Sequence, residues 1–201
     1  MRSTDNDRCR ATAGRPRCPG KQAAILDATL ALLAQQGFAR MTLDAVARAA
    51  GVSKATIHLR YRTKAALAAA ALGGLRTCAT PPPAADLHTE LAIHLDDFAH
   101  ALHSNHGMAL IGTCLAEEPH TPALLRHFRE HAVLPRRAAL RATLERARDR
   151  GALPACTDPE PLVSALLGAV SADHLAGRAH TPDSARATVR AVLGLCVSDD
   201  R

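Results

Sequence analysis

The basic residues of this 201-residue chain gather toward its beginning. Residues 1–64 contain twelve Lys or Arg and four Asp or Glu, a formal net charge of +8. Residues 65–201 contain thirteen and fifteen, a net charge of −2, and all three lysines lie in the first segment. Such a surplus attracts nucleic-acid phosphates, although basic residues can also form a merely solvated face. The charge distribution therefore predicts a nucleic-acid-binding head on a nearly neutral body.

Histidines and cysteines supply the other candidate chemistry. Ten of the eleven histidines lie beyond residue 65, and the six cysteines include no Cys-x-x-Cys pair, so we expect free, reduced thiols. The spacing of Asp96, His100 and His103, and that of His127 and His131, can bind zinc or nickel, but it also occurs on solvated helix faces. The sequence contains no nucleophile elbow, glycine-rich phosphate loop or metal-protease pattern. We therefore expect no enzyme activity, no cofactor and no resident metal.

The composition favours a helical protein. Apolar residues make up 47% of the chain and charged residues 22%, which allows a sizeable core. With three Phe, one Tyr and no Trp, that core must be aliphatic and rich in alanine, which suits packed helices better than a sheet. No apolar run reaches the roughly eighteen residues of a membrane span, and residues 1–20 lack the apolar segment of a secretory signal. We expect a cytoplasmic protein that does not enter a membrane.

Hydrophobic periodicity, capping residues and helix breakers predict an all-α chain of about nine helices. They cover 21–36, 43–50, 54–60, 64–72, 85–105, 107–117, 122–150, 159–176 and 182–196. Gly37 and Gly51 stand where the first two helices should end, and Pro135 should kink the longest. The segment Pro81-Pro82-Pro83 cannot be helical. These features predict a flexible basic arm over 1–20, a DNA-binding domain over 21–72 and a C-terminal domain over 84–201.

Two short predicted helices are joined by Ala50-Gly51-Val52-Ser53, a spacing typical of a helix-turn-helix. Gly51 permits a positive φ at the corner, Val52 fills the angle between the helices, and Ser53 caps the next helix. So short a helix is stable only within a three-helix head, and its N-terminal face suits the major groove of DNA.

This region resembles the DNA-binding head of the tetracycline-repressor (TetR) family of bacterial regulators. The resemblance covers about residues 21–72 and rests on Gly37-Phe38, the turn Gly51-Val52-Ser53-Lys54, Thr56, Tyr61 and Lys64. It implies an operator of double-stranded DNA as a partner. The length and helix count of the remaining chain fit the ligand-binding and dimerisation domain of that family.

The resemblance also implies which side chains meet DNA. The implied phosphate contacts are Thr42, Ser53, Thr56 and Lys64, the groove-facing residues are Lys54, Ala55, Leu59 and Arg60, and His58 and Tyr61 complete the set. Where His58 stands the family usually has an aromatic phosphate contact, and where Leu59 stands it usually has a polar residue. His58 can still donate to a phosphate, and Leu59 could contact a thymine methyl group.

In this family the middle helices of the C-terminal domain enclose a pocket for a small-molecule effector. The predicted pocket residues are His94, Phe98, Ile111, Cys114, Phe128, His131 and His174. Histidines could orient a polar ligand or change charge near neutral pH, although each could instead be a hydrogen-bonded core residue. Such a pocket suits a mainly apolar molecule with one or two hydrogen-bonding or acidic groups.

The resemblance further implies that the last two helices pair with their symmetry mates in a four-helix interface of a homodimer. The predicted interface residues are Leu162, Val163, Leu166, Leu167, Val170, Val189, Val192 and Leu193. The alternative is that these residues only close the core of the monomer.

Together these features predict a ligand-responsive, DNA-binding transcriptional regulator, most simply a repressor that a small, mainly apolar effector releases from a palindromic operator. The alternative is a metal- or redox-responsive regulator that uses the histidines and cysteines of the C-terminal domain.

Overall fold

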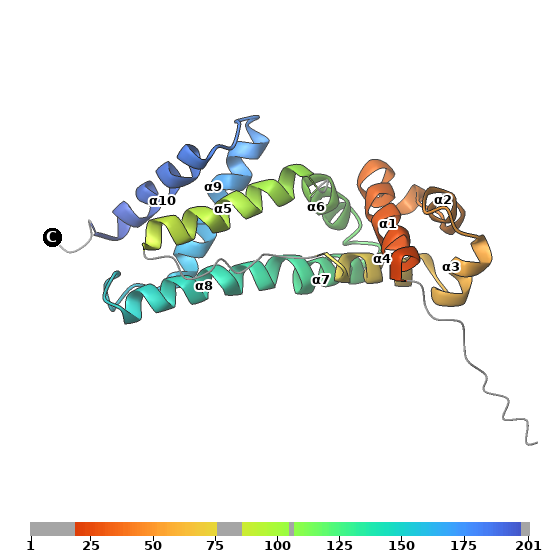
Figure 1. Ribbon diagram of the computed structural model, residues 1–201, viewed down its shortest axis with the longest axis horizontal. Coiled ribbons are helices and arrows are strands. Elements are labelled where there is room, and N and C mark those ends of the chain that lie inside the picture. Colours follow the sequence, from red (N-terminus) through yellow and green to blue (C-terminus); the bar gives the residue numbers. More distant parts are fainter. Residues whose placement is uncertain (1–18, 76–85, 105–106, 198–201) are drawn as a thin grey trace, which may run out of the picture.

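The computed structural model describes residues 19–75, 86–104 and 107–197, and these residues form helices and no strand (Figure 1). The helices are α1 (Pro19–Arg40), α2 (Leu43–Ala49), α3 (Lys54–Arg60), α4 (Lys64–Gly73), α5 (Leu87–Ser104), α6 (Gly107–Ala116), α7 (Pro122–Phe128), α8 (Leu134–Asp149), α9 (Pro159–Leu175) and α10 (Pro182–Val197). The predicted all-α fold is confirmed. Residues 1–18 of the predicted arm and the Pro81-Pro82-Pro83 segment lie outside the described residues.

The predicted long helix over 122–150 is α7 and α8, joined by a π-helical turn over Arg129–Val133. The turn stands directly before Pro135, whose ring would meet the carbonyl group four residues earlier in an α-helix. The N–H of Leu134 donates instead to the carbonyl of Arg129, five residues back, which widens the turn. The predicted kink at Pro135 therefore takes the form of a wider turn within a nearly continuous rod (Figure 1).

The predicted helix-turn-helix is formed by α2 and α3, with its caps in place. Thr42 Oγ1 accepts a hydrogen bond from the N–H of Ala45 at 3.1 Å, and Ser53 Oγ accepts one from Thr56 at 3.2 Å. Gly51 has a φ of 63°, the left-handed conformation that the corner requires. Gly37, with a φ of 76°, interrupts α1 where its end is predicted.

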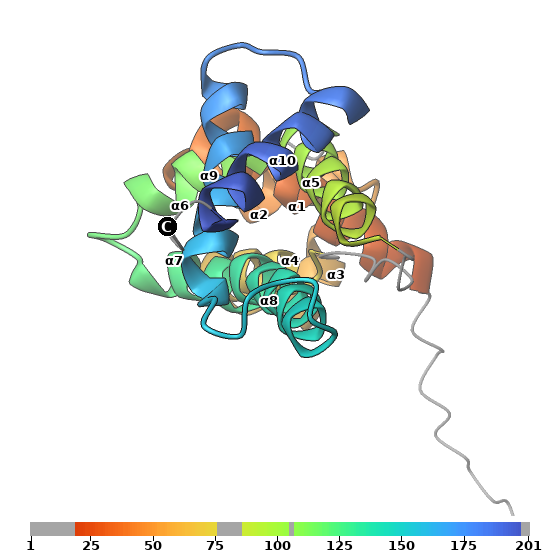
Figure 2. The same ribbon diagram turned by 90° about the vertical axis from the view of Figure 1, so that its left-hand side faces the viewer.

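Two clusters of buried apolar side chains hold the helices together. One joins α5, α8, α9 and α10, which lie in front of the head when the molecule is viewed along its long axis (Figure 2). The other joins the head helices α1 to α4 with α6 and α7, so that Ile25 and Leu67 share a core with Leu110 and Leu124. The hydroxyl of Thr113 on α6 also donates to the carbonyl of Leu33 on α1 at 3.1 Å. The core of the head therefore continues into the body.

The residues predicted to form a dimer interface lie in the chain's own core instead. The core side chains, each at most 9% exposed, are Leu162, Val163, Leu166, Val170, Val189, Val192 and Leu193, and Leu167 is partly buried against them. The apolar stripes of α9 and α10 face α5 and α8 because the large side chains of a surface helix turn toward its own core. The outer faces carry small exposed residues, among them Ala165 and Ala172 on α9 and Ala187 and Ala191 on α10.

No helix within residues 19–75, 86–104 and 107–197 is both long and apolar enough to cross a membrane.

Candidate DNA-binding face and effector cavity

Helix α3 turns one apolar side chain inward and leaves the others in solvent. Ile57 is fully buried and anchors α3 in the head core. Of the ten predicted DNA-binding residues, the exposed ones are Thr42, Ser53, Lys54, Ala55, His58 and Leu59, the partly exposed ones are Thr56, Arg60 and Lys64, and Tyr61 is buried. Leu59 is 89% exposed, so its methyl groups are free to meet an apolar partner such as a thymine methyl.

The hydroxyl groups predicted to contact phosphate first stabilise the motif itself. The oxygens of Thr42 and Ser53 accept bonds from backbone N–H groups, and Ser53 Oγ lies 2.9 Å from Thr56 Oγ1. A hydroxyl that accepts a hydrogen bond can still donate its own proton. The caps therefore hold these groups at the exposed ends of α2 and α3 without removing their ability to donate to a phosphate.

Lys64 and Tyr61 have structural partners that the sequence does not reveal. The ammonium of Lys64 donates to the carbonyls of Phe38 at 2.8 Å and Ala39 at 3.1 Å, and lies 4.4 Å from the centre of the Phe38 ring. It thus ties the start of α4 to the end of α1, where helix carbonyls favour a cation. The hydroxyl of the buried Tyr61 accepts a hydrogen bond from Gln22. Tyr61 is therefore a core residue of the head rather than a surface one.

The two groove-facing cations are also held by neighbouring residues. Lys54 Nζ lies 2.8 Å from Asp44 Oδ2, and both side chains are more than half exposed. Such a pair contributes little to stability, so phosphates can replace the carboxylate at small cost. Arg60 Nη1 donates to Gln22 Oε1 at 2.7 Å. Gln22 on α1 thus orients the side chain at the end of α3.

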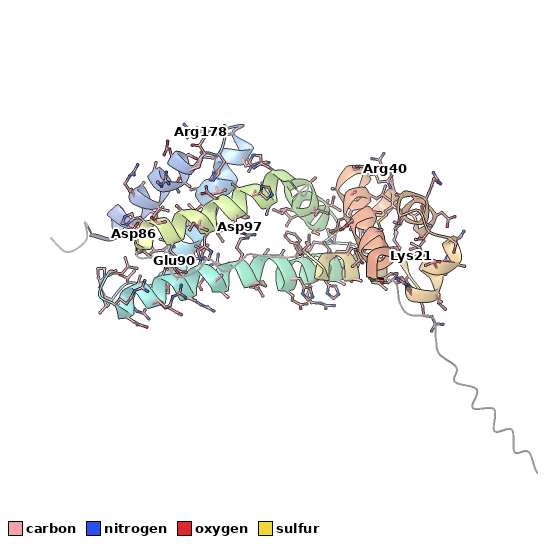
Figure 3. All side chains as sticks on the ribbon, in the orientation of Figure 1. Lys21, Arg40, Asp86, Glu90, Asp97 and Arg178 are labelled. Atoms are coloured by element: carbon pink, nitrogen blue, oxygen red, sulfur yellow. The ribbon has the colours of Figure 1, made fainter. Side chains whose placement is uncertain are left out.

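The described head is strongly basic. Residues 19–75 contain seven Lys or Arg and two Asp. Beyond the predicted contacts, Lys21, Arg40, Arg48 and Arg62 are exposed, and Figure 3 shows Lys21 and Arg40 on the head helices. These cations lie on α1 and α2 and between α3 and α4, so the part of the chain that carries the helix-turn-helix is also the basic one, as binding to DNA phosphates requires.

A cavity of about 340 Å³ lies among α5, α6, the α7–α8 rod and α9. This size is at the lower end of the range for small-molecule sites. The lining residues are Leu75, Phe98, Ala101, Leu102, Gly107, Leu110, Ile111, Phe128, Ala132, Val133, Arg136, Arg137, Ser164, Leu167, Gly168 and Ser171. Three of the seven predicted pocket residues, Phe98, Ile111 and Phe128, are on the wall, and the mostly aliphatic lining matches the expected character.

The polar groups of the cavity are two arginines on α8 and two serines on α9. Arg136 is almost fully buried and donates to Asp97 Oδ2 at 2.8 Å. Arg137 donates to Glu160 Oε2 at 2.5 Å and to Ser164 Oγ at 3.1 Å. The sequence carries no signal that separates these two from the other three arginines of α8, since only the tertiary packing turns them toward the cavity.

The structure places none of the three predicted pocket histidines on the cavity wall. The buried His94 Nε2 lies 3.1 Å from Thr143 Oγ1, which in turn donates to the buried Glu90 at 3.2 Å. Burial lowers the pKa of His94, so the ring is neutral at physiological pH. Glu90 and Asp97 lie on the side of α5 that faces α8 (Figure 3). His94 is thus a core residue of the α5–α8 contact.

The other two histidines lie at separate places. The ring of His174 is within 3.2 Å of His103, between α9 and α5. The exposed His131 stacks on His127 with 6.1 Å between ring centres. A carbon atom built on Gly73 of α4 would lie 3.6 Å from the His131 ring, so His131 lies beside α4 rather than in the cavity.

Cys114 and the residues with metal-ligand spacing have ordinary surroundings. Cys114 is 2% exposed in the cluster that the head shares with α6 and α7, and it does not line the cavity. Burial raises the pKa of its thiol to about 11, so Cys114 is not a reactive thiolate near pH 7. Cys114 and Cys156 are free cysteines.

Of the residues with metal-ligand spacing, Asp96 pairs with His180 at 2.7 Å. Ligand atoms of His127, Glu130 and His131 lie within 4.8 Å of one another, the one such group among the described residues.

Known proteins share both halves of this arrangement. The family model "Bacterial regulatory proteins, tetR family" matches residues 25–71, and "Tetracyclin repressor-like, C-terminal domain" matches residues 81–192. The uncharacterized HTH-type transcriptional regulator Rv1556 of Mycobacterium tuberculosis is 32% identical over 187 residues, which cover 90% of this chain and 92% of that protein. The uncharacterized HTH-type transcriptional regulator YdeS of Bacillus subtilis is 31% identical over 161 residues, which cover 78% of this chain and 79% of that protein.

Solved structures agree with the sequence relatives. The flavonoid-responsive regulator FrrA superimposes with a TM-score of 0.69 at 25% identity, covering 90% of this chain and 96% of that one. The TetR family transcription regulator SCO0332 superimposes with a TM-score of 0.60 at 27% identity, covering 87% of this chain and 97% of that one. These matches confirm the family resemblance and the expectation of a regulator rather than an enzyme. The chain belongs to the TetR family of DNA-binding transcriptional regulators.

Proposed function

We propose that this protein is a repressor whose dimer binds a palindromic operator in the cytoplasm and is released when a small, mainly apolar molecule enters the cavity. The observation that carries the proposal is a shared wall. Leu110 and Phe128 line the cavity and also belong to the core that holds the head, and Ile111 packs against that core. A ligand that moves these side chains must also repack the contacts of α6 and α7 with α1 and α4.

The shared wall gives a simple route from ligand to DNA affinity. An effector shifts the equilibrium between two conformers only by its difference in affinity for them. A preference of about 3 kcal/mol for the conformer with displaced heads would weaken operator binding roughly a hundredfold. A change in the packing of Leu110 and Phe128 bears directly on the two helices, α1 and α4, that support the helix-turn-helix.

The proposed operator contact places α3 in the major groove. Its exposed face offers Lys54, Ala55, His58 and Leu59, with Arg60 at its end. The hydroxyls at the starts of α2 and α3 lie where they can donate to phosphates on either side. This assigns base contacts to α3 and phosphate contacts to the helix ends, while Lys64 acts chiefly by holding α4 against α1.

The proposed dimer uses the outer faces of α9 and α10. A helix-turn-helix reads two half-sites about one helical turn apart only when a second subunit supplies the other head. The small exposed side chains of Ala165, Ala172, Ala187 and Ala191 would let two copies of these helices approach closely. The large apolar residues of the same helices then support the interface from inside each subunit.

The metal- or redox-responsive alternative has weaker support. The neutral, buried thiol of Cys114 does not suit a redox sensor. Among the described residues, a metal-responsive regulator could use His127, Glu130 and His131, and chelator-reversible release from DNA by Zn²⁺ would identify it.

The first prediction concerns Leu59. Leu59→Ala should leave thermal stability unchanged because the side chain is 89% exposed. It should weaken binding to an operator selected from a random DNA pool by about 1 kcal/mol, roughly fivefold, and leave random DNA unaffected. Fluorescence anisotropy measures both affinities. The control is Leu134→Ala, which removes another exposed leucine at the start of α8, outside α3 and outside the helices of the proposed dimer interface. An equal loss on both DNAs, or none on either, would contradict a base contact.

The second prediction concerns assembly. The protein should be a dimer at micromolar concentration, and the double variant Ala172→Glu with Ala191→Glu should be a folded monomer. Unpaired carboxylates buried between subunits cost several kcal/mol, whereas both sites are exposed within one chain. Light scattering gives the mass, and Ala138→Glu on the exposed side of α8 is the matched control. A monomeric wild-type protein, or a dimeric double variant, would rule out this interface.

The third prediction tests the link between the cavity and DNA. Decanol, a mainly apolar probe, should weaken operator binding by the wild-type protein. Ala101 on α5 lines the cavity and is partly buried. Ala101→Phe places a larger side chain on this wall, away from the α9 face proposed for the dimer, and should keep operator binding but lose the response to decanol. The same response in both proteins would place the effect outside the cavity, and no response in either would contradict the coupling.

A further inference from the structure

The charged residues that line the cavity are both cations. Arg136 and Arg137 reach the wall from α8, and the remaining lining residues are apolar apart from Ser164 and Ser171. We infer that the cavity selects an amphipathic monoanion, a molecule with an apolar body and one carboxylate, and that these two arginines bind its head. This inference rests on the proposed function, because it takes the cavity to be the effector site.

Arg136 is the more deeply buried anchor. Its side chain is 7% exposed, and its guanidinium lies 5.0 Å from the centre of the Phe98 ring, on the cavity wall. One N–H donates to Asp97 at 2.8 Å, and Asp97 does not line the cavity. A guanidinium has five N–H groups in a planar fork that matches a carboxylate, and the bond to Asp97 uses one of them.

Arg137 shares its carboxylate partner with a third arginine. Arg137 bonds Glu160 Oε2 at 2.5 Å, while Arg141 bonds the other oxygen, Oε1, at 3.2 Å. The hydrogen bond from Arg137 lowers the pKa of Glu160, so this carboxylate stays ionised at neutral pH. Arg141 also pairs with Glu145 at 3.9 Å, and Glu160, Arg141 and Glu145 do not line the cavity. Arg137 is therefore the charged residue of this cluster that reaches the cavity wall.

Of the two serines, Ser164 adds a donor to the head-group site between α8 and α9, whereas the hydroxyl proton of Ser171 is already used within α9. Ser164 Oγ accepts from Arg137, so its proton can be donated to a ligand oxygen. Ser171 donates to the carbonyl of Leu167 at 2.9 Å and fixes the nearby turn of α9. The apolar lining residues Leu110, Ile111 and Phe128 come from α6 and α7, whereas the arginines and serines come from α8 and α9. A ligand with its carboxylate at α8 and α9 would direct its apolar body toward the wall shared with the head.

The positive charge of Arg136 and Arg137 determines which ligand head group the cavity prefers. A charge-assisted hydrogen bond is stronger than a neutral one, so a carboxylate gains from both guanidinium groups, most from the buried Arg136. An alcohol of the same length can form hydrogen bonds but lacks the charge, and an amine places a third cation beside two others. The order of affinity should therefore be carboxylate, alcohol, amine.

The test is calorimetric titration of the full-length protein, without DNA, with decanoate, decanol and decylamine at pH 7.5. Decanoate should bind roughly tenfold or more tightly than decanol, and decylamine should bind most weakly. Arg137→Met should reduce the preference for decanoate over decanol severalfold, with Arg136 still present, while leaving decanol affinity unchanged. Arg141→Met is the matched control, since it removes the other partner of Glu160 from outside the cavity and should keep the preference.

Arg136→Lys, which keeps a charge but removes the fork, should lower decanoate affinity and leave the melting temperature close to wild type. Equal affinity for decanoate and decanol in the wild-type protein, or an undiminished preference in Arg137→Met, would overturn the inference. If decanoate is preferred but does not change operator affinity, the anion site stands and the proposed regulation fails. If the alcohol alone binds and releases DNA, the regulation stands and the anion site fails.

Discussion

The head of this protein shares its core with two helices of the body. The apolar side chains inside α1 to α4 continue without a break into α6 and α7, where Leu110, Leu124 and Phe128 close the cluster from the body side. Helices as short as α2 and α3 are not stable alone, so their position depends on this packing. Because Leu110 and Phe128 also form part of the cavity wall, one set of side chains supports the DNA-binding motif and meets whatever the cavity contains.

Charged residues of the head also hold its helices together. Lys64 holds the start of α4 to the end of α1 through two backbone carbonyls, and Gln22 connects Arg60 to Tyr61 across the head. Removing such a residue changes the shape of the binding face as well as its charge. Lys54, by contrast, has only an exposed partner and is free to exchange it for phosphate. Burial thus separates the exposed cations that can meet phosphate from those with partners inside the head.

Local features were predictable from the sequence because local chemistry determines them. The caps at Thr42 and Ser53, the corner at Gly51 and the break at Gly37 each depend on a residue and its immediate neighbours. Periodicity also identifies the apolar stripes of α9 and α10, but it does not say whether another helix of the same chain or a second subunit covers them. Leu166 and Val189 fit either interpretation in the sequence, and the structure buries both fully within one chain.

The cavity was predictable in its apolar part and not in its polar part. Phe98, Ile111 and Phe128 are recognisable as apolar residues of the middle helices, whereas Arg136 and Arg137 resemble every other arginine of α8 in the sequence. His94 was expected at the cavity, but its partner Thr143 lies forty-nine residues away and holds it in the core. Such pairings depend on which faces of distant helices meet, which one sequence does not specify.

The shared core can be tested by hydrogen exchange in the full-length protein without ligand or DNA. Phe128→Ala and Leu144→Ala both truncate buried side chains, one in the cluster shared with the head and the other in the cluster of α5, α8, α9 and α10. At early exchange times Phe128→Ala should increase exchange in α1 and α4, and Leu144→Ala should increase it only in the body helices. Equal exchange of α1 and α4 in both variants, or no change there in Phe128→Ala, would contradict a head that depends on the cavity wall.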